Sequence, residues 1–251
     1  MKTGVALSGG GIESGFAAIG VLYQLAQSGI QLQPISVSGV SSLIACMLAC
    51  GYTQQETIQI FTRFYNKFRV NADINKMRRN IKKIFRNKNI IKLNDLDFKI
   101  AINSIDILTG DTVVFLNRIE HKSAGDTYII DDVNIENAIV ASFGLTSSKN
   151  ALKLNKRRLA DQAIKQRYAI STLYLMGVQK VLSIFMDQRG IKNGSVLMSL
   201  AGISSGACFV PVIKPDITIT ISDKALDKEY VESVKEMVRA KMDDIYDALY
   251  F

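Results

Sequence analysis

The chain has 251 residues, of which 48% are hydrophobic, and a formal net charge of +8. This size and composition favour one α/β domain spanning residues 1–251 over two small domains. No window approaches the roughly 18 apolar residues of a membrane-spanning helix, and the N-terminus lacks the layout of a signal peptide. We therefore expect a cytoplasmic protein, and the three cysteines indicate neither a disulfide framework nor a metal site.

The N-terminal segment is predicted to form a strand, a glycine turn and a helix in direct succession. Residues 5–7 are apolar, residues 9–11 are all glycine, and residues 16–26 carry apolar side chains at helical spacing, which predicts one buried stripe ending at Ala26. Consecutive glycines can take positive φ, so several N–H groups can converge beside the positive end of a helix dipole. This pattern fits an anion or oxyanion cradle, and a plain structural turn is the alternative.

A second strand, residues 35–38, is followed by Gly39-Val40-Ser41-Ser42-Leu43 and then by an apolar helix that ends near residue 51. A dinucleotide-binding site would place a carboxylate at the tip of this strand, and the sequence has none there. Strand, serine and helix together are typical of a nucleophile elbow. Such an elbow is expected to hold Ser41 exposed at the strand tip, where it can act as a nucleophile.

The charge of the chain is concentrated in a basic helical segment, residues 63–92, which has eleven basic residues and one acid, Asp73. A capping box formed by Thr53 and Glu56 is predicted to open the helix before it. Apolar side chains are interleaved with the basic ones, so the segment is amphipathic. The simplest interpretation is a solvated helical face. The alternative is an anionic membrane surface, and we find no motif for nucleic acid. The residues expected at the membrane are Arg78, Arg79, Lys82 and Lys83.

The second half of the chain contains further strands and a final helix. Residues 98–102 and 113–116 resemble a hairpin joined through residues 104–111, and residues 159–164, 181–185 and 217–221 are also predicted strands. The stripe of apolar residues from 231 to 249 predicts one docking helix. Alternating strands and helices predict a doubly wound, mostly parallel central sheet flanked by helices.

Three motifs together resemble those of the patatin-like phospholipases, namely a GGGxRG loop, a GxSxG elbow and a later Asp-Gly, and the resemblance covers most of the chain. The matching residues are Gly9, Gly10 and Gly11 in the loop, Gly39 and Ser41 in the elbow, and Asp161. Residues 138–143 resemble the short helix that precedes the family's catalytic Asp.

The resemblance implies a serine lipid acyl hydrolase of phospholipase, lysophospholipase or carboxylesterase type, with a lipid or acyl-ester substrate and no metal or organic cofactor. Ser41 would be the nucleophile and Asp161 the base. The amides of the glycine loop would hold the oxyanion.

Three residues depart from the family pattern. Glu13 stands at the loop arginine, Leu43 at the last glycine of the elbow, and Gln162 at the glycine after the catalytic Asp. Leu43 is expected to crowd the elbow helix, and Gln162 is expected at a turn that needs positive φ. These departures fit either a divergent hydrolase or a catalytically impaired patatin-fold protein that acts as a membrane-surface binding or scaffold protein.

Two other residues compete for a catalytic role. Residues 202–206 match GxSxG in full, but the run before them resembles a helix and prolines follow at 211 and 215, so Ser204 opens no helix and is interpreted as a decoy. The single histidine, His121, lies in a polar stretch predicted to be a loop. A Ser-His-Asp triad would need that loop to fold over the site, so a structural or exposed role is expected.

Overall fold

The structure, a computed structural model, describes residues 2–9, 11–70, 73–118, 127–143, 151–162, 169–187, 217–222 and 228–250. Its strands are β1 (Thr3–Gly9), β2 (Ile35–Ser38), β3 (Ile100–Asp106), β4 (Thr112–Leu116), β5 (Thr127–Ile130), β6 (Leu152–Leu154), β7 (Arg157–Asp161), β8 (Lys180–Asp187) and β9 (Ile217–Ser222). They form one sheet in the order β5-β4-β3-β2-β1-β8-β9, with β7 and then β6 added beside β3. The pairs from β3 through β2, β1 and β8 to β9 are all parallel. The predicted mostly parallel central sheet is confirmed.

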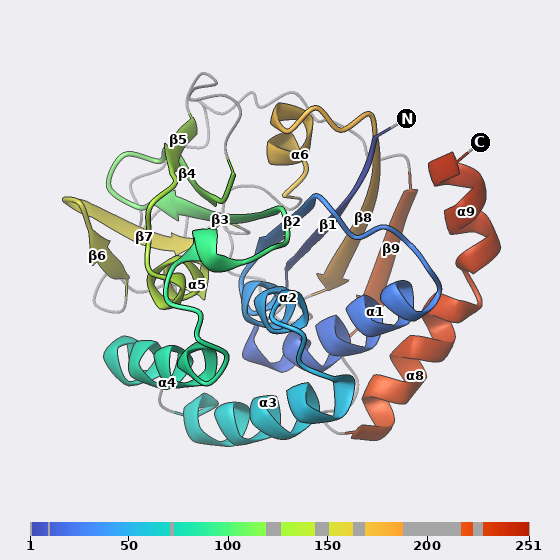
Figure 1. The fold of residues 1–251 in the computed structure, drawn as a ribbon, viewed down its shortest axis with the longest axis horizontal. Helices are drawn as coiled ribbons and strands as arrows, with labels where there is room; N and C mark the ends of the chain where they lie inside the picture. The colour runs from blue at the N-terminus through green and yellow to red at the C-terminus, as the bar shows by residue number, and fades with distance from the viewer. Residues whose placement is uncertain are drawn as a thin grey trace.

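Helices cover both faces of this sheet (Figure 1). The 3₁₀ turns are η1 (Ile12–Ser14) and η2 (Leu93–Asp95), and the α-helices are α1 (Gly15–Gln27), α2 (Ser41–Ala49), α3 (Gln54–Phe68), α4 (Ile74–Arg86), α5 (Ile135–Phe143), α6 (Ser171–Leu175), α8 (Lys228–Arg239) and α9 (Met242–Tyr250). The large core lies between the sheet and the layer with α1, α2 and α3. On the opposite face, α6 packs on β1 and β2 through a smaller apolar cluster. The sheet is therefore flanked by helices, as predicted.

Helix α1 is buried more completely than its sequence pattern predicted. Every residue from Gly15 to Leu25 is buried, because α1 is packed against α8, α2 and α3 and its side chains belong to the large core. A Cβ on Gly20 would lie 2.8 Å from the Val231 carbonyl oxygen, so only glycine permits this close approach. The expected single stripe was wrong in one further respect, since Ala26 is exposed.

The expected single C-terminal helix was also wrong. The chain forms two helices, α8 and α9, with Ala240 and Lys241 between them. The apolar side chains of the predicted stripe are buried all the same, and they are Val231, Val234, Val238, Met242, Ile245 and Leu249. The break lets α8 pack along α1 while α9 reaches β8, a path that one straight helix could not follow.

The basic segment forms two amphipathic helices. Thr53 and Glu56 make the predicted capping box at the start of α3, and the Asp73 side chain caps α4. The apolar side chains of both helices lie in the core. They are Phe61, Phe64 and Phe68 of α3 and Met77, Ile81, Ile84 and Phe85 of α4. The two helices therefore present mainly polar and charged side chains to solvent.

Candidate active site

The site is organised by two strands that meet end to end on the same edge of β3. Strand β4 occupies the other edge, so β2 and β7 must share this one. Ser38, the last residue of β2, pairs with Asn103, and Asp161, the last residue of β7, pairs with the next residue, Ser104. The two strands run toward each other. Their carboxyl ends therefore meet at one point, although they are far apart in sequence.

The chain turns sharply at Gly39, because β7 occupies the position into which β2 would otherwise continue. Gly39 has a φ of +63°, which a side chain would disfavour, and α2 begins two residues later at Ser41. A Cβ on Gly39 would lie only 2.8 Å from Oδ2 of Asp161. The Asp161 carboxylate thus lies against the bare backbone of the elbow, two residues from Ser41.

Ser41 is at the expected turn, but it is not exposed as expected. Its exposed fraction is 0%, and its Oγ has no hydrogen-bond partner among the residues that the structure describes. The end of β7 and helix α5 pack around the elbow, which explains part of this burial. Buried hydroxyls without a partner are uncommon in folded proteins, and the described residues contain two others, Ser38 and Ser183.

Two further serines hold the elbow in place, and the sequence patterns did not identify either of them. The carbonyl oxygen of Gly39 accepts from the Ser42 N–H at 3.1 Å and from the Ser42 hydroxyl at 2.7 Å. The Ser142 hydroxyl, on α5, lies 2.8 Å from the Ser42 hydroxyl and 2.8 Å from the Ile139 carbonyl oxygen. Through these contacts, and a bond from the Ser142 hydroxyl to the Gly39 carbonyl oxygen at 3.3 Å, α5 holds the peptide between Gly39 and Val40.

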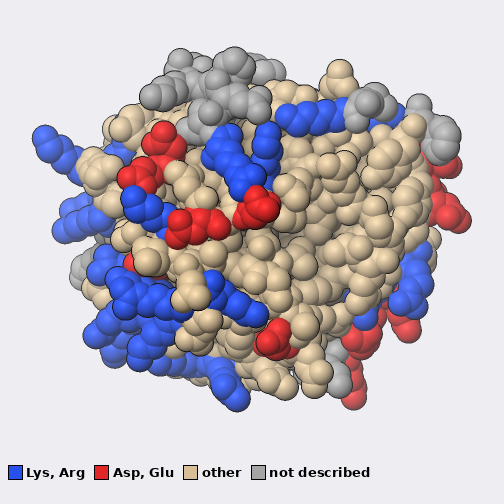
Figure 2. All heavy atoms as spheres, viewed as in Figure 1, with Lys and Arg blue, Asp and Glu red and all other residues tan. Residues whose placement is uncertain are grey.

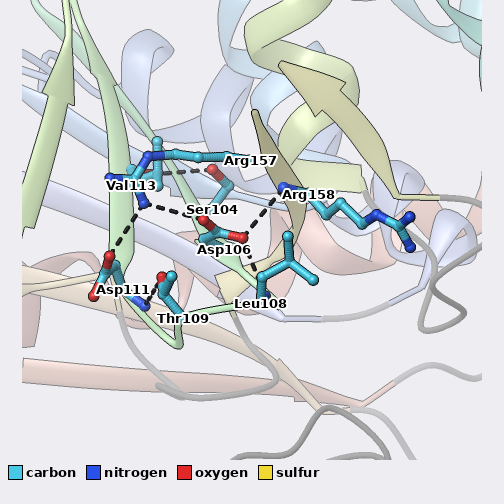
Figure 3. Close-up of polar contacts among 8 residues, drawn as sticks. All are labelled: Ser104, Asp106, Leu108, Thr109, Asp111, Val113, Arg157 and Arg158. Carbon is cyan, nitrogen blue, oxygen red and sulfur yellow. Dashed lines mark hydrogen bonds and ion pairs between the residues drawn. The ribbon is translucent and has the colours of Figure 1, made fainter. Parts of the chain in front are cut away.

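A partly buried ion-pair cluster joins β7 to β3 (Figure 3). The Arg157 guanidinium donates to Asp106 at 3.0 Å and to Asp111 at 3.1 Å, and Asp106 has a side-chain exposure of 2%. The other oxygen of Asp106 accepts from the backbone N–H of Arg158 at 3.2 Å. Partial burial lowers the pKa of Arg157, but the bonds to Asp111 and Asp106 outweigh it and raise that pKa above its ordinary value. The cluster therefore stabilises the pairing in which Asp161 lies opposite Ser104, beside the elbow.

The glycine loop leaves the sheet beside the elbow. Strand β1 pairs in parallel with β2, with Leu7 opposite Val37, so Gly9 ends β1 at the level where β2 turns. Gly11 follows, and its carbonyl oxygen accepts from the Ser14 hydroxyl at 2.7 Å. The carboxyl ends of parallel strands commonly carry the binding sites of such sheets. Gly10 and the side chain of Glu13 lie outside the described part of the structure.

The family model of the patatin-like phospholipases matches residues 5–164. The chain belongs to the patatin-like phospholipase family. The match includes β1, the glycine loop, the elbow and β7. No curated protein matches the chain. Membership of this family places the protein, at a coarse level, among lipid acyl hydrolases.

Two departures from the patatin-like motifs can be compared with the structure. Gln162 follows β7 in a 3₁₀ turn and is buried, and it is not among the residues with positive φ. The expected backbone strain was therefore wrong, because the chain passes this point without a left-handed residue. Leu43 is 0% exposed and belongs to the core that α1 and α2 share.

Both competing residues, Ser204 and His121, lie outside the described residues. The described part of the chain has no group of three or more His, Cys, Asp or Glu side chains that could hold a metal ion. In the same part, no helix is long and apolar enough to cross a membrane.

The predicted membrane-binding residues lie on α4. Arg79 and Lys83 are exposed, and Arg78 and Lys82 are half-buried. Lys82 also lies 3.6 Å from the buried carboxylate of Glu136 on α5. Lys and Arg side chains gather over α3 and α4, at the lower left of Figure 2.

Proposed function

We propose that this protein is a serine acyl-ester hydrolase that acts on lipids or lysolipids through Ser41 and Asp161. The observation that carries the proposal is the position of the Ser41 hydroxyl. It is buried, has no hydrogen-bond partner among the described residues, and follows Gly39, which has no room for a side chain beside the Asp161 carboxylate. Family membership supports the same class of reaction.

The proposed reaction is an acyl transfer in two steps. Ser41 Oγ attacks the ester carbonyl carbon while Asp161 takes its proton, and the negative charge on the carbonyl oxygen is held by backbone N–H groups of the loop at Gly10 and Gly11. Collapse of this intermediate breaks the ester bond and returns the proton to the departing alcohol. Water then attacks the acyl group on Ser41, and Asp161 acts as base again. The bond between the acyl carbon and Ser41 Oγ then breaks, the carboxylic acid leaves, and Asp161 returns a proton to Ser41 Oγ, so both side chains are regenerated.

Labelling with a fluorophosphonate probe tests this function against the alternative of a catalytically silent scaffold. Wild-type protein and Ser204→Ala are expected to be labelled, and Ser41→Ala is expected to lose the label. Asp161→Asn should label far more slowly, because an amide cannot take the serine proton. Folded wild type that takes no label would favour the scaffold. Label that is lost in Ser204→Ala and kept in Ser41→Ala would identify Ser204 as the nucleophile in place of Ser41.

We further propose that the basic segment brings the protein reversibly to anionic membranes, where a lipid substrate is available. The large apolar side chains of α3 and α4 are in the core, and Val70 between the helices is exposed, so attraction of charge would drive this binding with little insertion. Binding should weaken with salt, since the Debye length shrinks from about 10 Å at 0.1 M to about 3 Å at 1 M.

Sedimentation with vesicles measures this association. Phosphatidylcholine vesicles that contain phosphatidylserine should bind the protein, and pure phosphatidylcholine vesicles should not. Changing the four predicted residues to Gln should reduce binding, and the changed residues are Arg78, Arg79, Lys82 and Lys83. Equal binding to both vesicles, or no loss in the variant, would leave the segment as a solvated helical face.

A further inference from the structure

The surface of α3 and α4 contains an open hollow bordered by four Lys and Arg side chains, whose apolar stems form part of its lining. Its volume is about 210 Å³, and its lining residues are Lys67, Lys76, Arg79, Asn80 and Lys83. Four of these residues lie at helical spacing along one side of α4, and Lys67 comes from the last turn of α3. The hollow is therefore built by two helices, and it is only partly shared with the four residues proposed above for membrane contact.

The positive charge of the hollow is poorly compensated. Within the described part of the chain, Lys67, Arg79 and Lys83 make no ion pair. Lys76 lies 3.9 Å from Asp73, but that carboxylate already accepts from two backbone N–H groups at the start of α4. Like charges held this close repel one another, and a bound anion would relieve that repulsion.

We propose that this hollow is a binding site for a phosphomonoester group, which carries about −1.5 to −2 charge at pH 7 and three strong acceptor oxygens. At about 210 Å³ the hollow is larger than the space that a single water needs, and it is open enough to admit a phosphate group. Lysine and arginine make charge-assisted hydrogen bonds to phosphate, and the Asn80 amide adds a neutral donor.

The same group can come from a phospholipid headgroup or from a soluble phosphate. In both cases the proposal concerns a defined site instead of a diffuse attraction, and it does not depend on the hydrolase activity proposed for Ser41. A phosphodiester such as that of phosphatidylserine has fewer charges and acceptors on its phosphorus. The hollow should therefore prefer phosphatidic acid to phosphatidylserine when the surface charge of the vesicles is equal.

The test compares two double variants that remove the same charge from the same helices. Lys67→Gln with Lys83→Gln changes the lining of the hollow, whereas Arg63→Gln with Arg86→Gln changes exposed cations that do not line it. Vesicles contain phosphatidylcholine with either phosphatidic acid or phosphatidylserine, matched in surface charge. On phosphatidic acid the hollow variant should lose at least about tenfold more affinity than its control, because one charge-assisted bond contributes that much.

Asn80→Leu leaves the charge unchanged, so it should weaken binding to phosphatidic acid and leave binding to phosphatidylserine as it was. Ser41→Ala should bind as wild type does, which separates a failure here from a failure of the proposed hydrolase. Thermal unfolding of each variant shows whether it is folded.

Inorganic phosphate, compared with chloride at equal ionic strength, distinguishes the two sources of the group. Displacement of wild type from phosphatidic acid vesicles shows that the lipid headgroup and free phosphate share the hollow. Calorimetric binding of inorganic phosphate that is lost in the hollow variant, without a preference among vesicles, identifies the soluble source. Equal losses in both double variants, with no preference for phosphatidic acid and no binding of inorganic phosphate, would overturn the proposal.

Discussion

Replacing Gly39 with alanine tests the geometry of the elbow directly. The new Cβ would sit 2.8 Å from Asp161 Oδ2, a separation that such atoms essentially never show, so the carboxylate has to move. The backbone adds its own cost, since a φ of +63° disfavours alanine by about 1–2 kcal/mol. The crowded atom is the end of a side chain, so turning the carboxylate away adds about 0.5–1.5 kcal/mol. Displacement of a catalytic group by about 1 Å can lower activity about 100-fold.

Gly51→Ala is the matched control. Gly51 also has a positive φ, +74°, and a Cβ there would have nothing within 4 Å. Both variants should therefore lose the roughly 1–2 kcal/mol of stability that alanine costs at positive φ. Each kcal/mol lowers the Tm of a chain of this size by about 2–4 °C. Only Gly39→Ala should also lose ester hydrolysis, measured as kcat/KM on a chromogenic acyl ester. Its loss of stability should exceed that of the control.

A double-mutant cycle with Asp161→Ala separates the two contributions. Once the carboxylate is gone, adding Gly39→Ala should cost only the backbone term, so the two changes should be non-additive. The reasoning would be refuted if Gly39→Ala retained the stability and activity of Gly51→Ala. It would also be refuted if the cost of Gly39→Ala were the same with and without Asp161.

Two further predictions concern buried polar groups. Arg157→Met leaves the buried carboxylate of Asp106 without its cation, and it should lower the free energy of unfolding by about 3–5 kcal/mol in urea titrations; a loss under 1 kcal/mol would contradict a role in holding β7. The Tyr23 hydroxyl donates to the Tyr52 carbonyl oxygen at 2.6 Å and contacts Thr57 Oγ1 at 2.6 Å, and burial raises its pKa to about 12. Because a raised pKa favours the protonated native state, this contribution is complete below pH 10 and is lost as the pH rises toward 12. Over that range wild type should lose up to about 3 kcal/mol more stability than Tyr23→Phe, and parallel pH profiles would count against the assignment.

The local elements of this protein could be predicted from short stretches of sequence. The apolar run before the glycine loop, the helix that follows it and the serine at a strand-to-helix turn each depend on residues that are close in the chain. The Thr53 and Glu56 capping box is another example, since both partners lie within one turn. The sequence patterns failed where the course of a helix depends on the elements against which its apolar side chains pack. The final stripe was predicted as one helix, and packing on both α1 and β8 divides it into α8 and α9.

The sequence by itself determined the class of fold, the order of its motifs and the position of Ser41 at a strand-to-helix turn, because hydrophobic period and turn chemistry act over a few residues. Only the tertiary structure decided how the site is assembled. Strands β2 and β7, which run in opposite directions, share one edge of β3, and this places Asp161 against Gly39. From α5, the Ser142 hydroxyl donates to the carbonyl oxygen of Gly39. These contacts join residues about a hundred or more positions apart. The register of β7 on β3 depends on strand pairing and on the ion pair between Arg157 and Asp106, and no local sequence pattern predicts it.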